Sequence, residues 1–202
     1  MAKVEFFFDY SSPWTYLAFT KIEGLCQKYN AELSWRPILV GGIFNTVNPS
    51  VYEFRERGVP AKVRYYAKDL QDWARFYGLK IIQPSVFPVN SVKSLRGALV
   101  ALEQGKFSPY SYRVFEAYWG EDKDISKDEV LKGIVTETGL DPEEYFDKIN
   151  RQEYKDRLRA NTDECMVRGG FGTPTIFVNG SMFFGNDRLT LVEEELKKST
   201  ER

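Results

Sequence analysis

The sequence contains no histidine among its 202 residues. Histidine is the side chain whose ordinary pKa lies nearest neutrality, and it supplies the base of Ser-His and Cys-His pairs and many metal ligands. Its absence excludes sites of those kinds. Acid–base chemistry in this chain must therefore use Asp, Glu, Lys, Tyr or Cys side chains, or a group that belongs to a bound ligand.

Cysteine is nearly absent too, because Cys26 and Cys165 are the only two and lie far apart in sequence. Two distant cysteines form neither a disulfide framework nor the closely spaced ligand pairs of a zinc site. We expect both to be thiols of the core. Without a Cys-x-x-Cys pair, disulfide oxidoreductase activity is the least favoured function.

The sequence also lacks an excess of either charge and a long apolar run. Lys and Arg total 28 and Asp and Glu total 29, which gives a formal net charge of −1. This balance argues against a basic surface for nucleic acid. No apolar run approaches the about 18 residues of a membrane span, and Glu5 interrupts the short apolar start, which is unlike a secretory signal. We expect a cytoplasmic protein.

Two strand patterns enclose a helix pattern in the first 40 residues. Residues 3–10 (KVEFFFDY) combine aromatic and β-branched residues, which is typical of a buried strand. Residues 14–30 carry apolar side chains at helical spacing, and residues 31–40 predict a second strand. A strand–helix–strand unit of this length favours two parallel strands.

The middle of the chain is predicted to be helical. Residues 41–50 are rich in Gly, Asn and Pro and predict a loop. From residue 51 to residue 169 the chain shows helical segments with recognisable starts and stops. The segments are 61–78, 90–105, 108–120, 126–139, 141–150 and 151–170. Strand character returns at 173–185 around Asn179-Gly180, a strong hairpin signal, and a helix is predicted at 187–198.

This order of elements is that of the thioredoxin fold. We predict an α/β, thioredoxin-like fold in which residues 51–169 form a large all-helical insertion between residues 1–50 and 170–202. In this fold a cis-proline opens the third strand and faces the start of the first helix. Thr173-Pro174 stands at that place, although an ordinary trans bond at a strand start is the alternative.

The turn before the first helix carries the most informative chemistry. Residues 12–15 read Ser-Pro-Trp-Thr, where a redox protein of this fold has Cys-Pro-x-Cys. A helix N-terminus has unpaired N–H groups and a partial positive charge, so it stabilises an anion. With Ser12 in place of cysteine, the chain cannot make its own thiolate there but can stabilise a thiolate that a ligand brings. From this turn alone, Ser12 as a simple helix cap remains the stronger interpretation.

Five segments, taken in their order and spacing, are together specific. They are FFFDYSSPWTYLA, WRPILVGGIFNTVN, AKDLQDWARFYGL, GGFGTPTIFVNG and FFGNDRL. With them the chain resembles the kappa-class glutathione transferases and the bacterial 2-hydroxychromene-2-carboxylate isomerases, which share a DsbA-like fold. The resemblance runs from the first predicted strand to the last helix, and it shifts the interpretation of Ser12 from cap to glutathione contact.

The resemblance implies a set of glutathione-binding residues. Ser12 matches the serine that hydrogen-bonds the glutathione sulfur. Thr173, before Pro174, matches the residue whose backbone pairs with the cysteinyl part, as a peptide strand added to a sheet edge. Asn186 and Asp187 match the pair that holds the γ-glutamyl end. An Asp carboxylate can pair with the ligand ammonium, and the alternative role of both residues is to cap the last helix.

Other positions are less firmly assigned. Asn48 matches an asparagine in the loop after the second strand, but the family shows Gly-Asn before a proline-rich stretch and this chain has VNPS. Arg188 is interpreted as a structural ion-pair partner. Trp14 and Phe44 are the preferred walls of a pocket for the second substrate. Further aromatic candidates, for which a core position is the alternative, are Tyr16, Tyr65, Tyr66 and Trp73.

The resemblance implies an enzyme that uses reduced glutathione and a small aromatic or hydrophobic substrate. The first interpretation is an isomerase of bacterial aromatic catabolism, which interconverts 2-hydroxychromene-2-carboxylate and trans-o-hydroxybenzylidenepyruvate by reversible addition of the bound glutathione thiolate. The alternatives are a general glutathione transferase or peroxidase, and a redox-silent binding module of the thioredoxin fold. The family also implies a homodimer. The side chain that binds the substrate carboxylate is left open.

Overall fold

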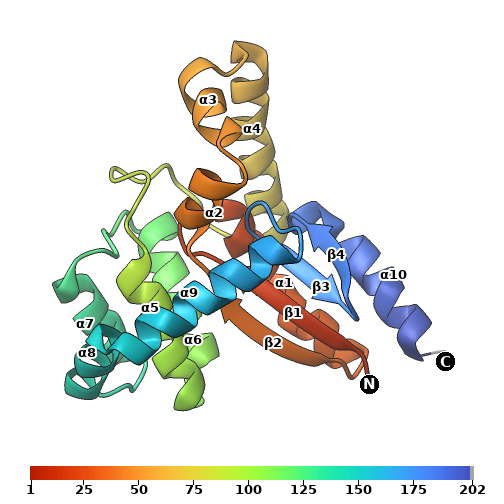
Figure 1. Ribbon diagram of the computed structural model, residues 1–202. Helices are drawn as coiled ribbons and strands as arrows, with labels where there is room; N and C mark the ends of the chain where they lie inside the picture. The colour runs from red at the N-terminus through yellow and green to blue at the C-terminus, as the bar shows by residue number, and fades with distance from the viewer. Residues whose placement is uncertain (201–202) are drawn as a thin grey trace.

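A four-stranded mixed sheet forms the centre of the fold (Figure 1). The computed structural model describes residues 1–200, and the strands are β1 (Lys3–Phe8), β2 (Glu32–Pro37), β3 (Thr175–Val178) and β4 (Ser181–Phe184). Their order is β2-β1-β3-β4. β1 and β2 are parallel, whereas β3 is antiparallel to both of its neighbours. The predicted thioredoxin-like α/β fold is confirmed.

Helices make up most of the remaining chain. Their bounds are α1 (Pro13–Lys28), α2 (Val40–Thr46), α3 (Ser50–Arg57), α4 (Pro60–Tyr77), α5 (Val92–Glu103), α6 (Phe107–Phe115), the π-helical turn η1 (Glu116–Gly120), α7 (Asp128–Glu137), α8 (Pro142–Asn150), α9 (Gln152–Val167), the 3-10 turn η2 (Asn186–Arg188) and α10 (Leu189–Thr200). The run of helices between β2 and β3 agrees with an all-helical insertion. The proposed division at residues 51 and 169 stays a prediction.

The two faces of the sheet belong to different clusters of buried side chains. Phe6 and Phe8 of β1 lie in the main core, together with side chains from α1, α5, α6 and α10. Phe7, on the opposite face, packs in a smaller cluster with Ile43 of α2 and Cys165 of α9. Because helices cover both faces at this end of β1, its last three residues, Phe6, Phe7 and Phe8, are all buried and apolar instead of alternating with polar residues.

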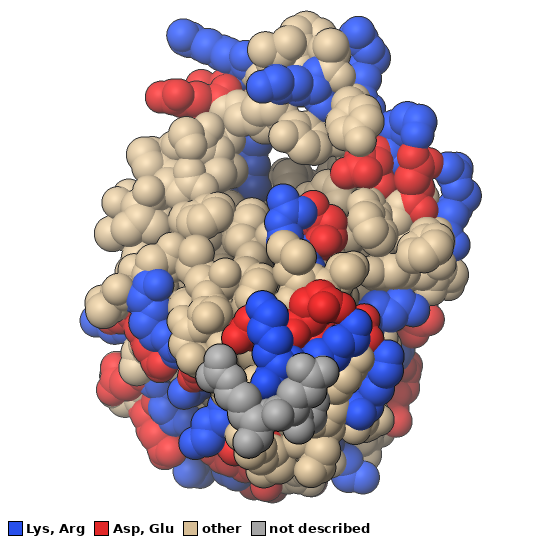
Figure 2. Space-filling model, turned by 90° about the vertical axis from the view of Figure 1, so that its right-hand side faces the viewer, with Lys and Arg blue, Asp and Glu red and all other residues tan. Residues whose placement is uncertain are grey.

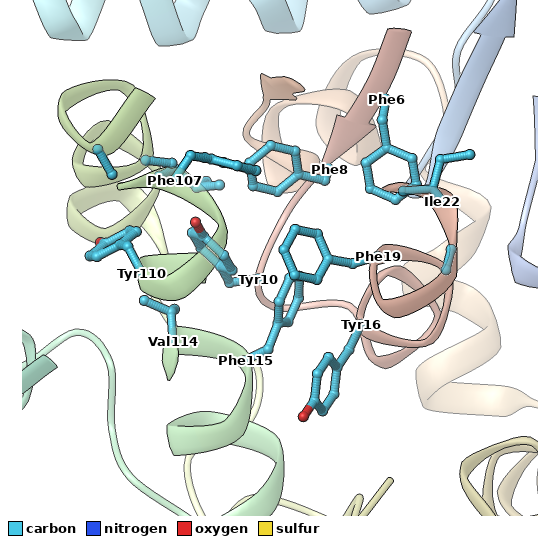
Figure 3. Packing of buried hydrophobic residues seen from close by; sticks show 14 of the residues in the cluster. Phe6, Phe8, Tyr10, Tyr16, Phe19, Ile22, Phe107, Tyr110, Val114 and Phe115 are labelled. Carbon is cyan, nitrogen blue, oxygen red and sulfur yellow. The ribbon is translucent and has the colours of Figure 1, made fainter. Parts of the chain in front are cut away.

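Aromatic rings from distant segments meet in the main core (Figure 3). The ring centroids of Phe8 and Phe107 are 5.6 Å apart, and Tyr16 stacks on Phe115 at 5.0 Å. Full burial of one such ring contributes about 1.5–3 kcal/mol. These contacts join β1 and α1 to α6, so the predicted thioredoxin-like part and the predicted insertion share one core.

The hairpin predicted around Asn179-Gly180 is confirmed. Asn179 and Gly180 have φ angles of 49° and 91°, the left-handed conformations that a two-residue turn between β3 and β4 requires. The Thr173–Pro174 peptide bond is cis, as predicted. A second cis bond, Phe87–Pro88, lies in the segment between α4 and α5 and was not predicted.

Two expectations next to the first strand pair are wrong. β2 ends at Pro37 instead of residue 40, and residues 41–50, predicted as a loop, form most of α2 and the start of α3. The buried Asp9 carboxylate accepts a hydrogen bond from the Val40 N–H at 2.9 Å, and Ile43 is fully buried. These tertiary contacts outweigh the low helix propensity of the two glycines in this segment.

α3 and the adjacent part of α4 lie away from the sheet, at the top of Figure 1. The C-terminal half of α4 reaches down to contact α1. α4 exposes large apolar side chains, with Tyr65 60% and Phe76 78% exposed. Along the described part of the chain, no helix combines the length and the apolar content that crossing a membrane would require.

Candidate active site

Ser12 stands at the junction between β1 and α1, and its side-chain hydroxyl makes two hydrogen bonds. Its Oγ accepts from the Thr15 N–H at 3.2 Å, so it is the N-cap of α1, with Pro13 in the first helical position. Its hydroxyl also donates to the Thr173 carbonyl oxygen at 3.3 Å. The same side chain therefore caps α1 and contacts the segment that opens β3.

Asp9 is buried beneath this turn and holds three segments together. Its Oδ1 accepts from the Ser11 N–H at 2.9 Å and from the Ser91 hydroxyl at 2.7 Å, and its Oδ2 accepts from the Val40 N–H. Burial raises the pKa of the Asp9 carboxyl, although the hydrogen bonds that it accepts act in the opposite direction. Asp9 thus fixes the Ser12 turn to the starts of α2 and α5.

Thr173 presents an open backbone edge next to Ser12. Only 6% of the residue is exposed, and its Oγ1 is buried with no hydrogen-bond partner among the described residues. Its backbone N–H is also unpaired within the described chain. The neighbouring Pro174 carbonyl accepts from the Gly185 N–H at 3.0 Å, which ties this segment to β4. Thr173 can therefore pair with an added peptide strand.

A first cavity, called the polar cavity below, lies between α4 and the segment before α10. It has a volume of about 320 Å³ and is bordered by Asp69 and residues 185–188, among others. Asn186 is 3% exposed, and its Nδ2 is buried without a partner in the described chain. Asp187 and Arg188 are about half exposed and form an ion pair. These groups can bind the ammonium and carboxylate of a zwitterionic ligand.

A second cavity, called the apolar cavity below, adjoins the first. Its volume is about 490 Å³, and aromatic side chains make up much of its wall. The aromatic members are Trp14, Phe44, Phe54, Tyr66, Phe87, Phe171 and Phe184. Four residues border both cavities: Trp14, Tyr66, Thr173 and Phe184. The face shown in Figure 2 is hollowed below the end that carries α3 and α4.

The structure brings most of the predicted glutathione-binding residues to these cavities. Ser12 lines the apolar cavity, Thr173 borders both, and Asn186 and Asp187 lie in the polar cavity. Asn48 lines the apolar cavity instead, where its Nδ2 donates to the Phe171 carbonyl oxygen at 3.0 Å. Buried Pro174 lines neither cavity but connects Thr173 to β3. The roles of all these residues stay proposals.

The aromatic candidates divide into wall and core. Trp14, Phe44, Tyr66 and Trp73 border a cavity, whereas Tyr16 is 5% exposed and packs on Phe115. Tyr65 lines neither cavity and is 60% exposed. Sequence reasoning missed four further aromatic wall residues, Phe54, Phe87, Phe171 and Phe184, and also missed Arg55. The hairpin register could have revealed Phe184, because it pairs with Thr175 beside the cis-proline.

The cysteines do not contribute to this site. Both are buried and unpaired, as expected, and burial raises the pKa of Cys26 to about 12 and that of Cys165 to about 11. Neither residue borders one of the two cavities. Within residues 1–200, no group of three or more Cys, Asp or Glu side chains is arranged to hold a metal ion.

Comparison with known proteins gives matches along nearly the whole chain. The model of the DSBA-like thioredoxin domain matches residues 3–197. A 2-hydroxychromene-2-carboxylate isomerase of Pseudomonas putida is 30% identical over 198 residues, which cover 96% of this chain and 93% of that protein. Glutathione S-transferase kappa 1 of Rattus norvegicus is 25% identical, with coverage of 94% and 88%.

Comparison with solved structures points to the same group of proteins. A solved structure of a 2-hydroxychromene-2-carboxylate isomerase superposes with a TM-score of 0.82 at 28% identity, and the match covers 97% of this chain and 95% of that one. The chain is therefore an enzyme of the DSBA-like thioredoxin family, in the group that contains 2-hydroxychromene-2-carboxylate isomerases and kappa-class glutathione transferases.

Proposed function

We propose that this enzyme binds reduced glutathione along Thr173 and uses the ligand's thiol to interconvert 2-hydroxychromene-2-carboxylate and trans-o-hydroxybenzylidenepyruvate. One observation carries the proposal: the Ser12 hydroxyl lies at the N-terminus of α1 and 3.3 Å from the Thr173 carbonyl oxygen. Thr173 in turn borders both cavities. The choice of reaction is supported by the relative of Pseudomonas putida, which is named for it.

The described residues fit a bound glutathione tripeptide. The unpaired N–H and the carbonyl of Thr173 can pair with the cysteinyl peptide groups as an added strand. Asp69, Asp187 and the Asn186 amide border the polar cavity, where a γ-glutamyl ammonium and carboxylate would lie. The Asn186 Nδ2 and the Thr173 Oγ1 are buried without partners. Leaving each such group unpaired costs about 1–3 kcal/mol, and a polar ligand would relieve that cost.

Ser12 would exchange one acceptor for another when the ligand binds. Its hydroxyl donates to the Thr173 carbonyl oxygen, and a ligand peptide N–H competes for that same carbonyl. A displaced hydroxyl can donate to the ligand's sulfur instead. The N–H groups in the first turn of α1 add a partial positive charge. Both effects favour thiolate over thiol and so lower the pKa of a bound thiol.

The apolar cavity would hold the second substrate beside this sulfur. The nucleophile would be the thiolate of bound glutathione. Its reversible addition to the conjugated substrate would convert a double bond into a single bond that can rotate before the thiolate leaves again. Trp14 and Phe44 would pack against the aromatic body of the substrate and keep water away from it. Because the nucleophile comes from the ligand, this chemistry needs no histidine in the chain.

Calorimetric titration with reduced glutathione tests the proposal. We expect wild type to bind at millimolar ligand or below. Asp187→Ala should weaken binding about tenfold, the usual scale for one charge-assisted contact, whereas Ser12→Ala should mainly lower the isomerisation rate. Absence of binding at millimolar glutathione would refute the proposal. Binding without isomerisation of the chromene carboxylate would instead favour a transferase reaction, for which the kappa-class relatives are named.

A cytoplasmic location and a homodimer belong to the same proposal. Tyr65 and Phe76 give α4 an apolar exposed surface, which a second copy of the chain could cover. Light scattering after size-exclusion chromatography would give twice the mass of one chain if the homodimer forms, and the mass of one chain if it does not.

A further inference from the structure

The apolar cavity contains one charged side chain among the described residues that line it. That side chain is Arg55, which α3 contributes. Its guanidinium carbon lies 5.7 Å from the ring centroid of Phe44 and 5.3 Å from that of Phe87. Both rings belong to the cavity wall. A cation within about 6 Å of an aromatic ring is attracted to it by cation–π interaction, so both rings hold Arg55 at the cavity.

Arg55 has no acidic partner in the described chain. The ion pairs of the structure include Arg188 with Asp187 in the polar cavity, but none of them involves Arg55. No hydrogen bond from its guanidinium to residues 1–200 is present either. The N–H groups of its guanidinium are therefore not engaged by other described residues, and a guanidinium can donate two parallel hydrogen bonds to the two oxygens of a carboxylate.

We propose that Arg55 binds the carboxylate of the second substrate, so that the apolar cavity selects planar aromatic acids. The assignment rests on the proposed function, in which a conjugated acid reacts beside Ser12. Ser12 and Arg55 line the same cavity from different elements. The volume of about 490 Å³ is in the range of small-molecule sites, so the cavity has room for one aromatic acid.

The division of charge between the two cavities supports this selectivity. The polar cavity carries two carboxylates, Asp69 and Asp187, and an arginine that is already paired. The apolar cavity carries an unpaired cation and aromatic walls. An aromatic acid therefore gains both ring packing and charge neutralisation in the apolar cavity, whereas a neutral aromatic compound of the same shape gains the packing alone.

The probes that test this are cinnamate and cinnamamide, which share a conjugated aromatic body and differ in charge. Calorimetry at low salt would measure the binding of each, both with and without glutathione. We expect wild type to prefer cinnamate about tenfold, the scale of one charge-assisted contact. Arg55→Met keeps an apolar stem against the rings and should abolish the preference, while Arg55→Lys should retain part of it.

Arg57→Met is the matched control, because Arg57 lies on the same exposed helix but lines neither cavity. It should keep the full preference. Equal binding of the two probes by wild type, or an unchanged preference in Arg55→Met, would overturn the assignment. Failure of glutathione to bind would refute the proposed function instead, since the probe comparison is also made without it. In the isomerisation assay, Arg55→Met should raise KM for the acid and leave glutathione affinity unchanged.

Discussion

Asp9→Asn should destabilise the fold by about 1–3 kcal/mol, the cost of one buried donor without an acceptor. In wild type, Oδ1 accepts from the Ser11 N–H and the Ser91 hydroxyl, and Oδ2 accepts from the Val40 N–H. An amide has the same shape but only one oxygen. Its NH2 group must face one of the two backbone N–H groups, so one buried donor loses its partner whichever way the amide is turned.

Two neighbouring variants bracket this value. Asp9→Ala removes all three acceptor contacts and should cost roughly 3–9 kcal/mol if the three donors behave independently. Ser91→Ala keeps both backbone contacts and should cost about 1 kcal/mol. Urea titration measures the free energy of unfolding for each. If Asp9→Asn is as stable as wild type, the reasoning about these three donors is refuted.

The difference in stability between wild type and Asp9→Asn should depend on pH. Because burial raises the pKa of Asp9, the folded protein keeps this proton at pH values where the unfolded chain has released it. The stability from this carboxyl is therefore complete below about pH 4, the ordinary value. It is lost as the pH rises through the raised folded pKa. The difference in unfolding free energy between wild type and Asp9→Asn should shrink along that rise, and a growing difference would contradict the raised pKa.

The remaining predictions concern two helical glycines and the two buried cysteines. Gly97→Ala should cost about 2–3 kcal/mol through overpacking, because an added Cβ would overlap the hydroxyl oxygens of Tyr110 and Tyr145. At Gly24 an added Cβ would meet nothing within 4 Å, so Gly24→Ala should instead stabilise α1 by about 0.5–1 kcal/mol. If the two substitutions shift the thermal unfolding temperature by the same amount and in the same direction, both predictions are contradicted. The buried cysteines, whose pKa values are raised to about 12 and about 11, should resist a thiol reagent at pH 8 until denaturant is added. Rapid labelling of the native protein would contradict that burial.

Features that depend on local chemistry could be predicted from the sequence. Ser12 is a residue type that caps helices through its hydroxyl, and Pro13 suits the first helical position, so the start of α1 is visible in the sequence. The Asn179-Gly180 turn forms because both residues tolerate positive φ. The order of these signals predicts the thioredoxin-like arrangement, in which the segment of Thr173 faces the Ser12 turn, and the structure places these two residues in hydrogen-bond contact.

Features that depend on tertiary packing could not be predicted in this way. α2 contains two glycines and forms because the sheet buries Ile43 and Asp9 accepts the Val40 N–H. Phe87 and Phe171 reach the apolar cavity from irregular segments, which have no periodicity to read. Arg55 resembles any exposed helical arginine in sequence, and only the two rings beside it mark it as a cavity residue.

The thiol pKa of bound glutathione tests the central claim most directly. Titration of the ultraviolet absorbance of the thiolate, in the complex with wild type and with Ser12→Ala, would measure it. If Ser12 and the N-terminus of α1 stabilise the ligand's sulfur, the wild-type complex has a thiol pKa below the about 8.5 of an ordinary thiol, and Ser12→Ala raises it toward that value. An identical pKa in the two complexes would remove Ser12 from the proposed chemistry.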